Sequence, residues 1–166
     1  MPRVGIALGS NLGDRLANLE AAVTCLREIA TCGEKFLQAS VYRTEPLLCP
    51  PGSPFFFNSV VEIEFRGSSG ELLEITQLIE RKLGRTGAPV RNAPRVIDLD
   101  LLYFGDEVIE TGTLILPHPR INERRFVLQP LAEILPDLVL PGQRQSIAFA
   151  LDHLESDEPP LVLVGR

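Results

Sequence analysis

Apolar positions alternate with small ones near the start of the chain, and this period of two is typical of a strand. Val4, Ile6 and Leu8 take the apolar positions, and a turn-rich segment, GSNLGD, follows. Apolar residues then recur every three or four positions over residues 16–29, which predicts an amphipathic helix. Gly33 fits the end of that helix. The chain therefore opens with a strand followed by a helix.

Two more strands and a second helix are predicted next. Residues 35–44 (KFLQASVYRT) and 57–65 (FNSVVEIEF) are rich in β-branched and aromatic side chains. The segment between them, EPLLCPPGSPFF, contains four prolines, which exclude regular structure and predict a stiff, exposed loop. Ser68 and Glu71 form a capping-box pattern before a second amphipathic run that ends at a glycine.

The stretch RVIDLDLLYFG, residues 95–105, predicts a fourth strand that carries two acids in its middle. Side chains two residues apart on a strand share a face, so Asp98 and Asp100 are expected side by side, about 6 to 7 Å apart. The opposite face is expected to join the core, and it carries Ile97, Leu99, Leu101 and Tyr103. An acid pair on a core strand calls for a positively charged counterpart.

The remainder predicts an extended, proline-broken segment at 114–122, a helix at 123–134 interrupted near Pro130, and a closing helix at 145–154. The order strand, helix, strand, strand, helix, strand is that of ferredoxin-like folds, with helices on one face of a mainly antiparallel sheet. The fold class is therefore α+β. At 166 residues, one domain spanning 1–166 is expected.

Composition and charge exclude several classes of protein. The hydrophobic share of 45% and the charged share of 23% are ordinary for a globular protein. No apolar run suits a signal peptide or a membrane span, so a cytoplasmic location is expected. The net charge of −6 argues against a broad nucleic-acid surface. The chain has three cysteines and no CxxC motif, which indicates reduced thiols rather than disulfides or a zinc site. They are Cys25, Cys32 and Cys49.

Basic residues gather in the second half of the chain, around the acid pair: Arg85, Arg91, Arg95, Arg120, Arg124 and Arg125. Alone, an acid pair also fits an exposed strand face, an arginine fits solvated surface, and a histidine beside prolines, such as His118, is more often structural. Together, carboxylates and guanidinium groups suit Mg²⁺ and a polyphosphate. GxxxxGK[ST] is absent, which excludes a P-loop.

A set of phenylalanines is the third candidate for a functional site. Residues 54–58 read PFFFN, and Phe126 follows later in the chain. Consecutive phenylalanines are most often core residues. An aromatic pair with one amide also describes a slot for a flat heterocycle, stacked on its faces and hydrogen-bonded at its edge. Asn58 is the candidate edge reader.

These segments resemble the signature segments of the 6-hydroxymethyl-7,8-dihydropterin pyrophosphokinase family. The matching segments follow in order and cover most of the chain: ALGSNLGDR, YRTEPL, PFFFNSVVEIE, RTGAPVRNAPRVIDLDLLYFG and LPHPRINERRFVLQPL. The resemblance implies a ferredoxin-like αβα sandwich. It also implies transfer of pyrophosphate from ATP to the 6-hydroxymethyl group of the reduced pterin, releasing AMP, in folate biosynthesis. We expect a monomer that acts on these two small molecules, without nucleic-acid or membrane partners.

The resemblance also implies roles for individual residues. Asp98 and Asp100 would hold two Mg²⁺ ions, and no separate general base is assigned. The expected pterin site comprises the backbone of Thr44 and Leu47, the stacking rings of Phe56 and Phe126, and the edge reader Asn58. The expected ATP site is lined by Gln77, Glu80, Arg85, Arg91, Arg95, Leu101, His118 and Arg124. The expected catalytic group comprises Arg95, Asp98, Asp100, His118 and Arg124.

The resemblance also implies a loop before Pro94 that closes over ATP. Asn92 and Ala93 stand there in place of the aromatic residue and the glycine that the family commonly carries, so a weaker or differently built closure is expected.

Two other classes of function stay open. A non-catalytic ferredoxin-like module could use the aromatic residues to stack nucleotides or RNA. An acid pair also occurs in metal-dependent transferases with nucleotide-sugar donors. The products separate these classes: AMP, no turnover, or a nucleoside diphosphate.

Overall fold

The computed structural model describes residues 1–31, 35–45, 52, 54–84 and 96–165. Its elements, in chain order, are β1 (Arg3–Ser10), α1 (Arg15–Ile29), β2 (Leu37–Gln38), β3 (Val41–Thr44), β4 (Phe56–Glu64), α2 (Ser69–Lys82), β5 (Asp98–Phe104), β6 (Ile109–Glu110), β7 (Ile115–Leu116), a 3₁₀ turn (Ile121–Glu123), α3 (Arg125–Ile134), α4 (Ile147–Asp152) and β8 (Val162–Gly165). Among these residues, no helix has the length and apolar character needed to cross a membrane.

The main sheet is antiparallel and has the strand order β5-β1-β4-β3-β8, with β2 also paired to β4. The first four strands of this order are those of the ferredoxin-like arrangement, which confirms the predicted fold class. β6 and β7 form a separate two-stranded ribbon. β8 was not predicted, because its four residues are too few to show an alternating pattern.

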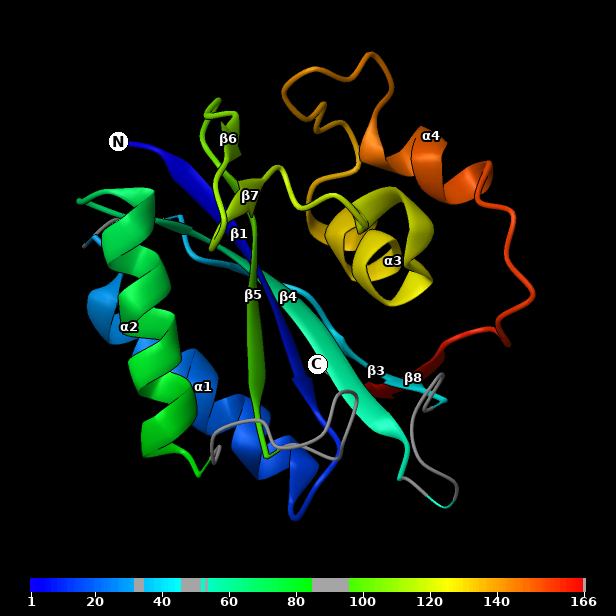
Figure 1. Ribbon diagram of the computed structural model, residues 1–166. Coiled ribbons are helices and arrows are strands. Elements are labelled where there is room, and N and C mark those ends of the chain that lie inside the picture. The colour runs from blue at the N-terminus through cyan, green and yellow to red at the C-terminus, as the bar shows by residue number, and fades with distance from the viewer. Residues whose placement is uncertain (32–34, 46–51, 53, 85–95, 166) are drawn as a thin grey trace.

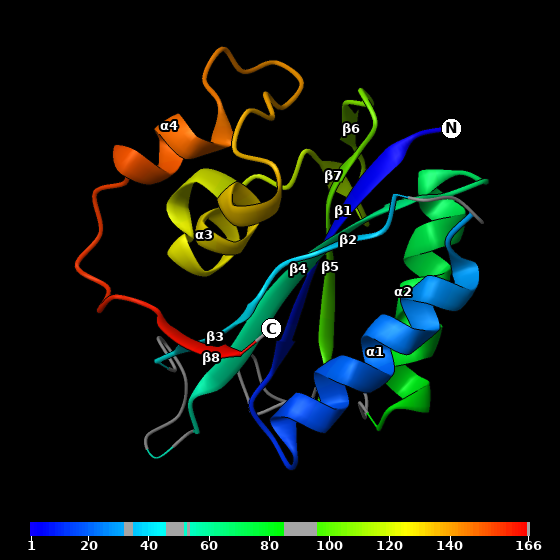
Figure 2. The same cartoon turned by 180° about the vertical axis from the view of Figure 1, so that it is seen from behind.

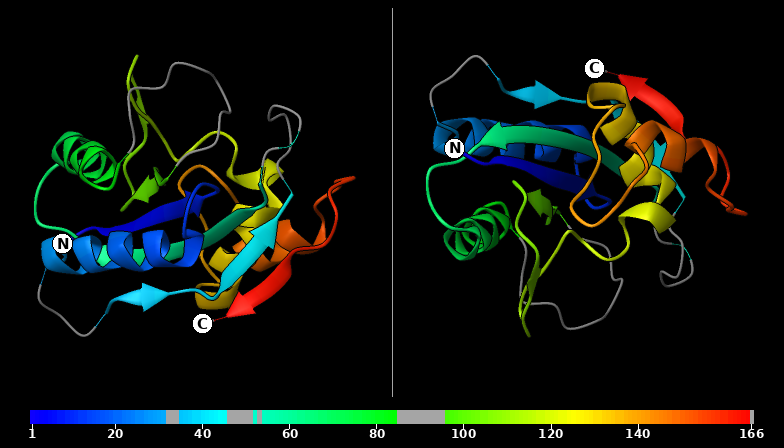
Figure 3. Two further views of the ribbon diagram at one scale, coloured as in Figure 1. Left: turned by 90° about the horizontal axis from the view of Figure 1, so that it is seen from below. Right: turned by 90° about the horizontal axis from the view of Figure 1, so that it is seen from above.

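Helices cover both faces of the sheet (Figures 1, 2 and 3). α1 and α2 pack on one face, where Val4, Ile6 and Leu8 of β1 join a large buried cluster. α3 packs on the other face, where Val60 and Leu102 belong to a second cluster, and α4 packs against α3. The element order predicted that the helices would lie on one face of the sheet. This prediction is correct for α1 and α2 but not for α3. The αβα sandwich is the observed architecture.

Local signals set most of the helix ends. Asp14 accepts a hydrogen bond from the backbone N–H of Ala17 at the start of α1. The capping box predicted at Ser68 is present with both of its hydrogen bonds. The end predicted for the first helix was wrong, since α1 ends at Ile29. Just beyond that end, the N–H of Thr31 donates to a carbonyl of β4, so a tertiary contact ends the helix before the glycine.

The predicted interruption of α3 is also wrong, because the helix is continuous through Pro130. Proline removes one helical hydrogen bond and crowds the preceding turn. Pro130 and Leu131 are buried, and α3 lies along the sheet over β4 and β3 (Figure 2). Burial of this strongly apolar face outweighs the lost hydrogen bond.

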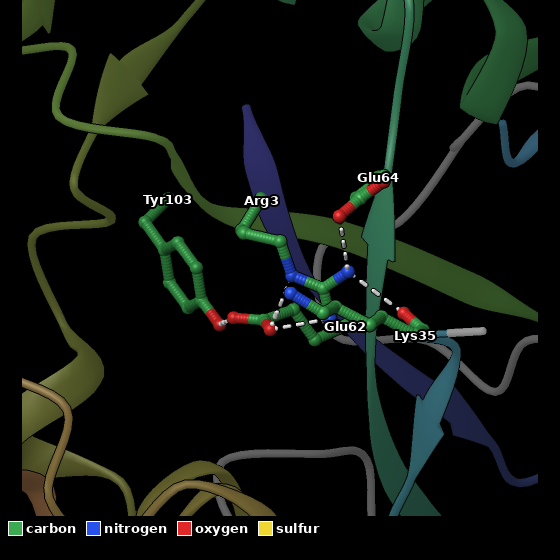
Figure 4. A network of polar contacts seen from close by, with 5 residues as sticks. All are labelled: Arg3, Lys35, Glu62, Glu64 and Tyr103. Carbon is green, nitrogen blue, oxygen red and sulfur yellow. Dashed lines mark hydrogen bonds and ion pairs between the residues drawn. The ribbon is translucent and has the colours of Figure 1, made fainter. Parts of the chain in front are cut away.

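A β-bulge in β5 corrects the predicted face of Tyr103. Gly5 lies opposite Tyr103 and Ile6 lies opposite Leu101, so β5 carries one extra residue at this point. An extra residue reverses the alternation of side chains. Tyr103 therefore faces α3, whereas Leu101 remains on the α1 and α2 side. The tyrosine crosses over Gly5 and donates its hydroxyl hydrogen to Glu62, which also accepts from Arg3 (Figure 4).

Candidate active site

Small residues of β1 form the floor of the candidate site. On the face toward α3, Gly9 lies between Asp98 of β5 and Asn58 of β4. In the next row, Ala7 lies opposite Asp100. Neighbouring strands are about 4.8 Å apart, so the backbones of Asp98 and Asn58 are separated by about 10 Å. Gly9 is the residue between them, so the acid pair and the candidate edge reader Asn58 lie on the same face of the sheet.

The acid pair lies at the start of β5, an edge strand of the sheet. Asp98 and Asp100 are half-buried, whereas Leu99 between them is buried on the opposite face. The backbone N–H of Leu99 donates to Oε2 of Glu80 at 3.0 Å, and Glu80 is only 5% exposed. The α2 carboxylate thus anchors the strand at the point where it carries the two aspartates.

The other residues of α2 and β5 expected near ATP lie in two different surroundings. Gln77 is exposed on α2, one turn before Glu80. The Leu101 side chain is buried in the cluster beneath α1 and α2, so only its backbone can face a ligand on the side of the acid pair.

His118 is held beside β5 by its backbone. Its N–H donates to the carbonyl oxygen of Leu102 at 2.7 Å, within the β-bulge. Bulges free backbone groups from the ladder and are common beside active sites. The N–H of Arg120 donates to Nδ1 of His118 at 3.1 Å. The neutral ring therefore carries its proton on Nε2.

Electrostatics join His118 and Arg124 to the acid pair. Burial, followed by the guanidinium groups of Arg124 and Arg120, lowers the pKa of His118, and Asp98 opposes this shift. Burial, followed by Arg120, lowers the pKa of Arg124, and Asp100 and Asp98 oppose that shift. Each basic group therefore lies within electrostatic reach of a carboxylate. Of the predicted catalytic residues, His118 and Arg124 thus lie near the two aspartates of β5.

The residues predicted for the heterocycle lie on β3, β4 and α3. Asn58 is 6% exposed, and its Nδ2 donates to Oγ1 of Thr44 at 2.8 Å. Phe56 is half-buried two residues earlier on the same face of β4. Phe126 is half-buried near the start of α3, and its ring centre lies 5.5 Å from the Arg124 guanidinium carbon. The structure thus places Phe56 and Asn58 on the sheet face that α3 covers.

Some predicted residues fall on the part of the chain without a described structure. These are Leu47, Arg85, Arg91 and Arg95, together with Asn92 and Ala93 of the expected closing loop. Two contributors were missed by the sequence prediction. The side chain of Thr44, rather than its backbone alone, holds Asn58. Gly9 lies between Asp98 and Asn58 without a side chain of its own, and the small residues that alternate with apolar ones in β1 were the signal that could have revealed it.

The donor set suits a hard divalent cation. Two carboxylates on one strand face offer oxygen ligands, and Mg²⁺ usually keeps water and takes phosphate oxygens beside one or two protein carboxylates. The described residues contain no cluster of three or more acidic, histidine or cysteine ligands. A cation that requires an all-protein cage is therefore not suited to the part of the site that is described.

A family model described as 7,8-dihydro-6-hydroxymethylpterin-pyrophosphokinase (HPPK) matches residues 5–136. A Bacillus subtilis protein, 2-amino-4-hydroxy-6-hydroxymethyldihydropteridine pyrophosphokinase, is 50% identical over 129 residues, which cover 78% of this chain and 75% of that protein. A Methylorubrum extorquens protein of the same name is 41% identical, with 90% and 93% of the two chains covered. The Schizosaccharomyces pombe folic acid synthesis protein fol1 is 40% identical, and the match covers 91% of this chain but only 20% of fol1.

Solved structures show the same fold in a longer chain. A crystal structure of Plasmodium falciparum wild-type HPPK-DHPS with SDX-DHP aligns with a TM-score of 0.70 at 13% identity, covering 91% of this chain and 44% of that one. A structure of HPPK-DHPS in complex with substrates aligns with a TM-score of 0.68 at 14% identity. This chain spans less than half of either structure, and the likeness concerns the fold.

Proposed function

Because the chain belongs to the 7,8-dihydro-6-hydroxymethylpterin-pyrophosphokinase family and performs the pyrophosphokinase step of folate biosynthesis, we propose how its residues carry out this transfer. The substrates are ATP and 6-hydroxymethyl-7,8-dihydropterin. The pterin hydroxyl oxygen forms a bond to the β-phosphorus of ATP, the bond from the β-phosphorus to the α-phosphate oxygen breaks, and the hydroxyl proton is lost. The products are AMP and the pterin diphosphate.

The single row across Asp98, Gly9 and Asn58 carries this proposal. Its β5 end presents the acid pair, and its β4 end presents an amide beside an aromatic ring. A phosphate chain with its cation fits the first end, and a flat heterocycle fits the second. The reacting hydroxymethyl group would then lie near Gly9, which has no side chain of its own between the two ends of the row.

Asp98 and Asp100 would hold two Mg²⁺ ions, and bound Mg²⁺ would supply charge neutralisation at the phosphate oxygens. Arg124 is a permanent cation near both carboxylates and is suited to donate hydrogen bonds to phosphate. His118 has a lowered pKa, so its ring is neutral near pH 7 and donates through Nε2. Both residues therefore stabilise negative charge on the transferred group without acting as the base.

Phe56, Asn58 and Phe126 would bind the pterin. Stacking on the two rings orients the plane of the heterocycle, and the amide of Asn58 selects its edge. The hydrogen bond from Asn58 to Thr44 limits the rotation of that amide. Orientation of this kind brings the hydroxyl close to the phosphate and lowers the entropic part of the barrier.

We further propose that the ATP site is also lined by Gln77 and Glu80 on α2 and by Arg85, Arg91 and Arg95. We also propose a monomer in the cytoplasm. The acidic net charge of −6 supports small-molecule substrates rather than nucleic acid as the partners.

The test is to incubate the protein with Mg²⁺ and ATP, with and without the pterin, and to separate AMP from ADP by chromatography. Pterin-dependent AMP that disappears on chelation of the metal is the expected result. Binding without turnover would favour a nucleotide-binding module. Asn58→Ala and Phe126→Ala are expected to raise the KM for the pterin more than the KM for ATP, and equal effects would contradict the proposed slot.

A further inference from the structure

The segment between β2 and β3 contains a second β-bulge. Gln38 lies opposite Val61 of β4, and Tyr42 lies opposite Asn58. Four residue steps along β2 and β3 thus correspond to three steps along β4. The extra residue explains why residues 35–44, predicted as one strand, form two. A shift by one residue turns every later side chain to the other face of the sheet.

Side-chain contacts on either side of the bulge show this reversal. Before it, the ring centre of Phe36 lies 3.9 Å from the guanidinium carbon of Arg27 on α1. After it, the odd-numbered residue Val41 joins the buried cluster on the α1 side. Tyr42 and Thr44 are thereby turned toward α3. Without the extra residue, Thr44 would face α1 and could not hold Asn58.

Glu133 of α3 contacts the bulge directly. Its Oε2 accepts hydrogen bonds from the backbone N–H and from the hydroxyl of Ser40, each at 2.9 Å. Its Oε1 accepts a hydrogen bond from the hydroxyl of Tyr42 at 2.6 Å. Ser40 is 3% exposed, and a buried N–H without an acceptor is costly. The neighbouring N–H of Ala39 still donates to the β4 backbone, so Glu133 serves the donor at the bulge itself.

α3 carries one ring of the proposed pterin slot and also contacts β3. Phe126 lies seven residues before Glu133 on α3, which is about 10 Å along the helix axis. Glu133 therefore ties the helix that carries one stacking ring to the strand that carries Thr44.

We propose that Glu133 is a positioning residue for the pterin. It holds the β3 bulge in register, so that Thr44 and Asn58 face the slot, and it sets the spacing of α3 from the sheet. This inference rests on the proposed pterin site at Phe56, Asn58 and Phe126.

The experiment measures KM for the pterin and KM for ATP separately in Glu133→Ala and Glu133→Gln, together with thermal midpoints. Glu133→Ala is expected to raise the pterin KM about tenfold through misplacement of the slot, with the ATP KM within about twofold. Glu133→Gln keeps an acceptor oxygen for Ser40 and is expected to restore most of the pterin affinity. The amide proton of Ser40 is expected to exchange faster with solvent in Glu133→Ala than in the unsubstituted protein.

Glu71→Ala is the matched control. It removes another hydrogen-bonding carboxylate, in the capping box at the start of α2, remote from the slot. It is expected to lower the thermal midpoint without changing either KM. Should Glu133→Ala not accumulate as folded protein, Glu133→Asp replaces it, because the shorter side chain cannot reach Ser40 and Tyr42 together.

An unchanged pterin KM in Glu133→Ala would overturn the inference. So would an equal rise in both KM values, or a Glu133→Gln variant as impaired as Glu133→Ala, because either result indicates a purely structural role. Failure of the proposed function can be distinguished from failure of this inference. In the first case the unsubstituted protein would release no pterin-dependent AMP. The inference fails alone if Asn58→Ala raises the pterin KM and Glu133→Ala does not.

Discussion

Removing one carboxylate of the acid pair is expected to abolish turnover while leaving the fold intact. The backbones of Asp98 and Asp100 are two strand positions apart, or about 6.7 Å. At an effective dielectric constant near 20, two unit charges at that distance repel by about 2.5 kcal/mol. Each carboxylate also attracts Arg124, which offsets part of that repulsion. Asp98→Asn or Asp100→Asn removes both effects, so the free energy of unfolding is expected to change by no more than about 1 kcal/mol.

Turnover is expected to respond far more strongly. A cation ligand that contributes about 3 kcal/mol to transition-state stabilisation corresponds to a loss of more than about a hundredfold in kcat. The assay is pterin-dependent AMP release under saturating Mg²⁺ and ATP. A thermal scan with and without Mg²⁺ and ATP gives an independent measure, because a ligand that binds only the folded state raises the midpoint. Both variants are expected to lose most of that rise.

Asp106→Asn is the control, because this exposed residue follows the end of β5 and lies beyond the acid pair. It is expected to retain both turnover and the ligand-induced rise in midpoint. Retained turnover in both acid-pair variants would refute the metal assignment. A large loss of stability in both would refute the electrostatic argument, since it would show that the acids stabilise the fold without a cation.

Three further predictions concern single residues of the same sheet face. Tyr103→Phe removes a buried hydrogen bond to a carboxylate and is expected to lower the free energy of unfolding by about 1.5–3 kcal/mol, measured by urea titration; a smaller loss would show that the hydroxyl is dispensable. The pKa of folded His118 lies below the unfolded value near 6.5, so the unfolded chain binds more protons than the folded chain as the pH falls. The contribution of His118 to the free energy of unfolding is therefore present above about pH 6.5 and is lost on acidification. The thermal midpoint of His118→Asn should therefore fall less than that of the unsubstituted protein as the pH is lowered, and parallel curves would contradict this. Gly9→Ala would place a methyl group 3.1 Å from Oδ1 of Asn58 and is expected to raise the pterin KM several-fold, whereas Gly112→Ala, which meets no atom within 4 Å, should leave it unchanged.

Local pattern was sufficient for most of the elements that carry the site. The alternation around Val4 to Leu8 and the capping box at Ser68 correspond to β1 and α2 as the structure has them. The failures lie where distant contacts decide. α1 ends early at Ile29, where the chain turns to pair with β4. α3 continues through Pro130 because its burial on the sheet outweighs a local preference.

For the candidate site, the sequence indicated which side chains share a strand face, but not how the candidate residues are held. Asp98 and Asp100 share a face because side chains on a strand alternate, and this needs no knowledge of the fold. Thr44 was expected to act through its backbone, yet its hydroxyl accepts from Asn58. That contact depends on the direction in which β3 faces, and the pattern of residues 35–44 does not reveal a change of direction within it.

The sequence by itself determined the order of the elements, the acid pair on one strand face, and the alternation of small and apolar residues in β1. Only the tertiary structure decided which face each strand end presents, because the bulge in β5 and the bulge between β2 and β3 reverse the alternation of side chains. At the β5 bulge the carbonyl oxygen of Leu102 accepts a hydrogen bond from the N–H of His118, and at the bulge between β2 and β3 the N–H of Ser40 donates to Glu133, 93 residues away. A bulge leaves backbone groups without ladder partners, so its stability depends on hydrogen-bond donors and acceptors from other segments of the chain.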